Sequence, residues 1–181
     1  MDEKKILEQY ESTLANNLLS MLSNMGLLKG QLLVSDDFYD QWNRISESYI
    51  ADSVKEFSNY PSAALGWAMY LGMAVAKYWD LDWDFYSKIP NLYEFIRDKR
   101  GYDYLDEEVR DTVLGLKNED FHMMEQLVQT CSEYTLSLIR HQHVEPRTAM
   151  AFYTYSSSVK VLFVGASLQM RRMGYDLSPL S

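Results

Sequence analysis

Aromatic and acidic side chains alternate along residues 78–86, and together they can bind a positively charged ligand. The segment reads YWDLDWDFY, so three carboxylates lie among rings that can offer their faces to a cation. The candidate ligand-binding residues of this segment are Trp79, Asp80, Asp82, Trp83, Asp84 and Tyr86. In the alternative interpretation the rings complete the edge of the hydrophobic core while the aspartates remain in water.

The three aspartates also match the first ligand positions of a calcium-binding EF-hand loop. Counted from Asp80, such a loop needs glycine at its sixth position and glutamate at its twelfth. Phe85 and Asn91 occupy these two positions. The sequence therefore excludes an EF-hand at this segment.

A second set of ligand-type side chains occupies alternate positions at His141, His143 and Glu145. In an extended segment the three would point to one side, and imidazole with carboxylate is a donor set that suits zinc or iron. In a helix, residues two apart point in different directions. The alternative interpretation is a histidine-rich helix end, because positive charge is favoured near a helix C-terminus.

Glu119 and His122 form a Glu-x-x-His pair, the spacing used in helical di-iron sites. Such sites need a second pair, and the chain has three histidines and no second pair. A surface histidine near the start of a helix is therefore the favoured interpretation. The sequence also lacks phosphate-binding glycine loops and nucleophile motifs, and its single cysteine, Cys131, falls on the apolar side of a predicted helix. We expect no cofactor and favour a non-enzymatic protein.

Length and composition describe one soluble globular domain over residues 1–181. The chain is 47% hydrophobic and 24% charged, which is ordinary for a domain that buries its own core. Its net charge of −9 opposes a nucleic-acid partner, because phosphate binding needs clustered lysine and arginine. A single cysteine and a charged N-terminus without an apolar leader predict a cytoplasmic location.

The elements that must position these side chains are organised around an apolar helix predicted at about residues 61–79. Ala64, Ala68, Gly72 and Ala76 recur every four residues and form a ridge of small side chains, while the other faces are apolar as well. A helix that is apolar all round lies in a core or in a membrane. Its uncharged part is shorter than the roughly 20 residues of a bilayer span. We therefore expect a buried central helix and no transmembrane segment.

The last long helix of the chain is the expected neighbour of this ridge. It offers a surface of small residues at Ser158, Gly165 and Ala166. Rows of small side chains allow two helices to approach closely, with ridges of one helix packed into grooves of the other. The sequence predicts that Gly72 faces this helix rather than solvent.

The whole pattern predicts an all-α fold, a single-domain bundle of six to seven helices around the central one. The expected helices span about residues 2–25, 36–58, 61–79, 92–100, 104–116, 118–141 and 146–173, and Phe152 is expected on the buried side of the last. A turn, or one helical turn capped by Asp82, is expected after the central helix. The other expected caps are Gly26, Ser35, Asn91 with Glu94, Gly101, Asp103 with Asp106, and Gly174.

The leading functional expectation is a non-enzymatic module that binds another protein or a second copy of itself. Four tryptophans, 14 tyrosines and ten methionines exceed what the buried faces require, and such residues are enriched at interface cores. The alternative is a helical bundle that binds a small molecule or a metal, either as a binding protein or as a hydrolase. That alternative requires several of the acidic, aromatic and histidine side chains to meet at one cavity.

Overall fold

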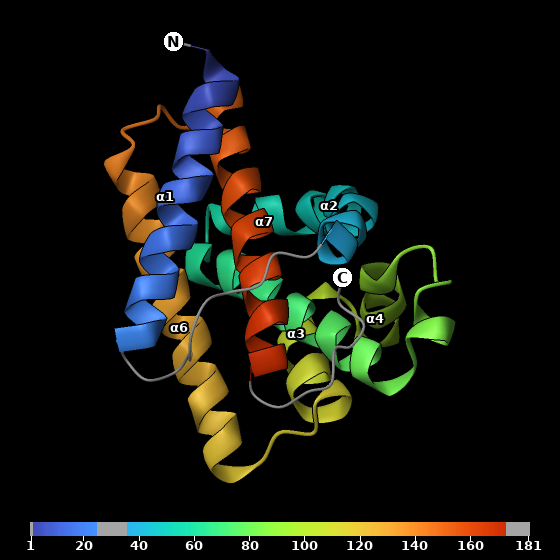
Figure 1. The fold of residues 1–181 in the computed structure, drawn as a ribbon. Coiled ribbons are helices and arrows are strands. Elements are labelled where there is room, and N and C mark those ends of the chain that lie inside the picture. The colour runs from blue at the N-terminus through green and yellow to red at the C-terminus, as the bar shows by residue number, and fades with distance from the viewer. Residues whose placement is uncertain (1, 25–35, 173–181) are drawn as a thin grey trace.

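The computed structural model describes residues 2–24 and 36–172, and within them every regular element is a helix (Figure 1). The α-helices are α1 (Glu3–Asn24), α2 (Asp36–Phe57), α3 (Pro61–Tyr86), α4 (Leu92–Arg100), α5 (Leu105–Glu107), α6 (Asn118–His141) and α7 (Ala149–Arg172). Two further helical segments are η1 (Tyr102–Tyr104), a 3-10 turn, and η2 (Glu108–Val113), a π-helix. The predicted all-α bundle is confirmed. The expected caps at Gly26, Ser35 and Gly174 lie outside the described residues.

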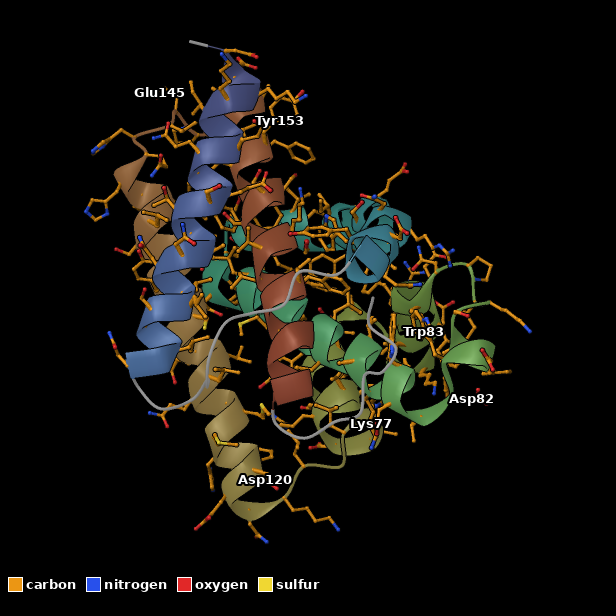
Figure 2. All side chains as sticks on the ribbon, viewed as in Figure 1. Lys77, Asp82, Trp83, Asp120, Glu145 and Tyr153 are labelled. Carbon is orange, nitrogen blue, oxygen red and sulfur yellow. The ribbon has the colours of Figure 1, made fainter. Side chains whose placement is uncertain are left out.

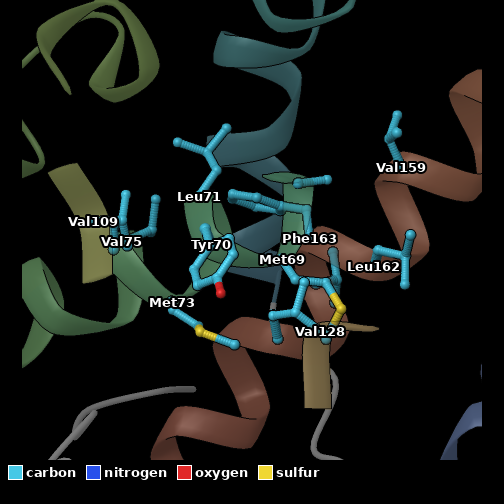
Figure 3. Packing of buried hydrophobic residues seen from close by; sticks show 14 of the residues in the cluster. Met69, Tyr70, Leu71, Met73, Val75, Val109, Val128, Val159, Leu162 and Phe163 are labelled. Atoms are coloured by element: carbon cyan, nitrogen blue, oxygen red, sulfur yellow. The ribbon is translucent and has the colours of Figure 1, made fainter. Parts of the chain in front are cut away.

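Helix α3 is the centre of the bundle, as its apolar sequence predicts. The residues from Ala64 to Ala76 are buried except for Trp67, which is half-buried, and Tyr78 and Trp79 are buried as well. Helix α7 makes the most extensive contact with it, and α6 covers a further part of its surface. Figure 3 shows Phe163 of α7 among the side chains of α3 in this core.

The predicted contact between the small ridge and the last helix is confirmed at Gly72. A Cβ atom at this position would overlap the carbonyl oxygen of Phe163 and lie 3.3 Å from the Cβ of Ala166. The other two small residues of α7 have different roles. Ser158 bonds to Tyr10 of α1, and a Cβ at Gly165 would meet no atom of the described part of the chain within 4 Å.

The end of α3 contains the helical turn that the sequence predicts. The backbone leaves helical geometry at Asp82 (φ −166°, ψ 80°), and its carboxylate accepts a bond from the Phe85 amide at 3.2 Å. Asp82 is therefore the cap of one last turn. Asn91 caps α4 in the same way, accepting from the Glu94 amide at 3.0 Å. Gly101 ends α4 with φ 92°, a conformation that favours glycine.

The expected continuous helix over residues 104–116 is wrong. The segment divides into η1, α5 and η2, and no side chain caps α5. The wide π turn is closed by a bond from the Leu114 amide to the Val109 carbonyl, five residues back. In this geometry Val109 stays in the core while Glu108 is held by the Arg100 guanidinium at 2.7 Å. The predicted Asp103 cap is also wrong.

Helix α7 begins three residues later than the proline suggests. Residues 146–147 form a turn, with Arg147 at φ 63°, and the Thr148 hydroxyl accepts from the Ala151 amide at 3.2 Å. The later start shortens α7, but the described part of its later turns is buried as expected. Phe152, expected in the core, is 44% exposed because it lies in the first turn, before α7 reaches α3.

None of the helices in residues 2–24 and 36–172 is long and apolar enough to cross a membrane.

Candidate functional site

A groove between α1 and α7 forms a cavity in the described part of the chain. Its volume is about 430 Å³, within the range of small-molecule sites. The two helices start at the same end of the molecule and run side by side (Figure 1). Apolar side chains of α1 and α7 form the walls, and α3 and α6 contribute Met69, Leu127 and Cys131.

The groove is open because small residues stand where side chains would otherwise fill it. Gly165 lines it from α7 and Ala15 from α1. Among the residues that the structure describes, no atom lies within 4 Å of a Cβ placed on Gly165. The same helix that closes tightly on α3 therefore leaves a hollow against α1.

A buried hydrogen bond joins the two helices next to the groove. The buried Tyr10 hydroxyl lies 2.6 Å from Ser158 Oγ. Since Ser158 donates its own hydrogen to the Thr154 carbonyl at 2.7 Å, Tyr10 acts as donor. Burial raises the pKa of Tyr10 to about 12. The phenol therefore remains a neutral hydrogen-bond donor at physiological pH.

An ion pair lies beside this bond, at the wall of the groove. Lys160 Nζ is 3.0 Å from one carboxylate oxygen of Glu11, and the Ser157 hydroxyl donates to the other at 3.0 Å. The Lys160 ammonium also lies 5.7 Å from the ring centre of Tyr39 on α2. Both charges of the pair thus have partners within the protein.

A shallower hollow of about 420 Å³ continues the groove towards the start of α1. It shares Glu8, Glu11 and Lys160 with the main cavity. Its outer lining includes Lys4 and Tyr153. Tyr153 marks this end of the molecule in Figure 2. The groove is thus charged at its outer end and apolar at its inner end.

Cys131 contributes a thiol to the floor of the cavity. Burial raises the pKa of this thiol to about 12, so it is protonated at neutral pH and a poor nucleophile. Its position in the core agrees with the inert role expected from the sequence. The chemistry that this cavity offers is apolar contact and hydrogen bonding.

The aromatic–aspartate segment lies at the far end of α3, well away from Tyr153 (Figure 2). Its aromatic rings stack in two pairs: Trp79 on Trp83, with centres 4.3 Å apart, and Tyr78 on Tyr86 at 4.2 Å. Trp79 and Tyr78 are buried by these contacts.

The aspartates of this segment differ in their surroundings. Asp82 and Asp84 are exposed, and the Asp82 carboxylate caps the last turn of α3, while Asp80 is half-buried. The rings thus seal the core edge and two of the carboxylates face solvent. Ligand binding by these residues stays a prediction.

The predicted metal ligands His141, His143 and Glu145 are all exposed, at the end of α6 and in the loop after it. Ring nitrogen Nδ1 of His141 lies 2.8 Å from the Ser137 carbonyl, so this side chain binds the last turn of its own helix. Within residues 2–24 and 36–172 no three ligand-type side chains are placed to hold a metal ion. His122 lies at the other end of α6, roughly 28 Å away along the helix, so the histidines do not converge.

The sequence analysis did not single out Glu8 and Lys160 as site residues, and it expected Gly165 on the surface that packs against α3 rather than at the groove. The available signal was small residues and opposite charges on the first and last helices, such as Ala15 with Gly165 and Glu11 with Lys160. These residues indicate a shared groove only once α1 and α7 are known to be neighbours. Residues about 150 positions apart give no local indication of this pairing.

The fold and the groove define a structural class, a helical bundle with a cavity between α1 and α7. The chain matches no family model, no curated protein sequence and no solved structure.

Proposed function

We propose that the protein is a non-enzymatic binding protein whose α1–α7 groove holds a small amphipathic molecule. The observation that carries the proposal is the unfilled space in front of Gly165, bounded by apolar side chains and opening at one end to charged ones. Binding sites for small molecules combine such apolar walls with a few polar groups that orient the ligand. The proposal takes up the second expectation from the sequence, with a different set of residues.

The proposal is tested with the neutral fluorescent probe N-phenyl-1-naphthylamine, whose emission rises in apolar surroundings. We expect saturable binding with one probe per chain. Gly165→Leu places a side chain in the empty space and is expected to weaken binding at least tenfold. The matched control is Gln9→Leu, which adds the same side chain at an exposed position of α1 outside the groove.

Two results would contradict the proposal: no saturable binding by the natural protein, or equal binding by the natural protein and Gly165→Leu. Circular dichroism and thermal unfolding of each variant show whether it is folded. Gly165 is in a helix, and no described atom lies within 4 Å of a Cβ at this position, so we expect this variant to fold.

A second candidate function, binding of a protein partner, rests on the exposed end of α3. Leu81 and Phe85 are 56% and 59% exposed there, four residues apart, and the carboxylates of Asp82 and Asp84 lie between them in sequence. Exposed apolar side chains among acids fit a basic, apolar segment of another protein. The net charge of −9 also favours a basic partner and disfavours binding to nucleic acid.

This candidate is tested with a synthetic helical peptide of leucine and lysine. Phe85→Asp is expected to abolish binding, whereas Tyr60→Asp, at the opposite end of α3 and 66% exposed, is expected to retain it. Equal binding by both variants would contradict the candidate. A dimer in native mass spectrometry that Phe85→Asp dissociates would instead make the partner a second copy of this chain. The single Cys131 supports action in a reducing compartment, and we propose the cytoplasm.

A further inference from the structure

We propose that the α1–α7 groove selects amphiphiles with a positively charged head, such as a long-chain primary amine, over fatty carboxylates. This inference rests on the proposed function, because it specifies the ligand of the same groove. It follows from the distribution of charge along the groove and from which charges already have partners.

The groove has a polar end and an apolar end, so it orients a ligand that has both. Glu8 and Glu11 come from the first half of α1, and Lys160 comes from the first half of α7. The later parts of both helices supply apolar walls, including Leu18, Leu22 and Val164. A ligand with an apolar chain is therefore held with its head near Glu8.

The charges at the polar end leave one carboxylate without an opposite charge. Glu11 and Lys160 neutralise each other, and each has a further contact, with Ser157 and Tyr39 respectively. Glu8 is exposed and forms no ion pair with any described residue. Among the described lining residues, two carboxylates and one ammonium give the main cavity a formal charge of −1.

The outer hollow does not change this balance. It adds Glu3 and Lys4, whose charges cancel, so the extended groove is also at −1. A carboxylate head placed here would face Glu8 and Glu11, and like charges brought together oppose binding. An ammonium head would pair with Glu8 without displacing Lys160 from Glu11. The geometry favours the ammonium for this reason.

The test is displacement of bound N-phenyl-1-naphthylamine by three ligands with the same chain: dodecylamine, dodecan-1-ol and dodecanoate. All are used at pH 7, at low ionic strength and below the concentrations at which they form micelles. We expect dodecylamine to displace the probe at a concentration at least tenfold lower than dodecanoate, with dodecan-1-ol between them. Glu8→Gln is expected to reduce the advantage of the amine over the alcohol by about threefold or more.

The matched control is Glu47→Gln, which makes the same change in net charge at an exposed position of α2 outside the groove. It is expected to leave the order and spacing of the three ligands unchanged. Equal displacement by all three, or an equal effect of Glu8→Gln and Glu47→Gln, would overturn the inference while leaving the groove as a binding site. Failure of the natural protein to bind the probe at all would instead overturn the proposed function.

Discussion

Helix α7 has two faces that differ in packing, and two glycines show the difference. On the face against α3, Gly72 allows the backbones to approach so closely that any side chain would overlap the Phe163 carbonyl. On the face towards α1, Gly165 borders a cavity of about 430 Å³. The first glycine is needed for packing, and the second leaves space that a ligand can fill. Whether a helical glycine allows close packing or borders a cavity therefore depends on the residues around it.

The largest effect is expected from the same substitution at both glycines. Gly72→Leu forces α3 and α7 apart, and we expect the free energy of unfolding to fall by about 3 kcal/mol or more, as for severe overpacking of a core. A Cβ at Gly165 has no described atom within 4 Å, and leucine is a better helix former than glycine, so for Gly165→Leu we expect an increase of up to about 0.8 kcal/mol. Urea denaturation measures both. Destabilisation of similar size at the two positions would show that the α1 face is as tightly packed as the α3 face.

The polar bonds that join α1 to α7 give the next largest effect, seen at high pH. Because the folded protein raises the pKa of Tyr10 from about 10 to about 12, the neutral phenol is favoured in the folded state. Its stabilising contribution is complete below pH 10 and is lost progressively as the pH rises to 12. Other buried tyrosines act in the same direction. Tyr10→Phe should therefore reduce the slope of stability against pH by at most about 1.4 kcal/mol per pH unit in this window.

Denaturation of the natural protein and of Tyr10→Phe at several pH values from 9 to 12 tests this expectation. The variant should also be about 1 kcal/mol less stable at pH 7, because it loses the bond to Ser158. An unchanged slope would mean that the Tyr10 hydroxyl titrates as in water, and hence that the α1–α7 contact at Tyr10 is open to solvent.

The smallest effect on stability is expected from the ion pair at the groove. Glu11→Gln removes the charge that faces Lys160, and both side chains are partly exposed. We expect a loss of about 0.5 kcal/mol that shrinks further in high salt. Thermal unfolding at two ionic strengths measures it. A loss of several kcal/mol would mean that the pair is a main support of the α1–α7 contact, rather than part of a site.

The sequence predicted those parts of the fold that depend on residues close together in the chain, within a few helical turns. The four-residue ridge ending at Ala76 indicated the close contact of α3, and Asn91 and Asp82 have side chains that cap a helix within three residues. The π-helix η2 was missed because it depends on Glu108 meeting Arg100 and on Val109 reaching the core. These tertiary contacts override a segment whose local pattern reads as an ordinary helix.

The candidate site was harder to predict than the fold for the same physical reason. Titratable and aromatic side chains were chosen as site candidates because of their chemistry. In the structure, however, His141 contacts a carbonyl of its own helix and Trp79 stacks on Trp83. The groove depends instead on what is missing, a side chain at Gly165, and on two helices from opposite ends of the chain. An absent side chain becomes a cavity only when the surrounding walls are in place.

The most direct test of the central claim, that the open face of α7 is a binding site, is methyl NMR of the protein during titration with N-phenyl-1-naphthylamine. We predict shifts in the methyl signals of Leu18, Leu22 and Val164, which line the groove. The methyl signals of Leu71 and Val75, two residues of α3 that are buried in the core, should hardly shift. Shifts concentrated instead at Leu81, or no shift at saturating probe, would contradict the account.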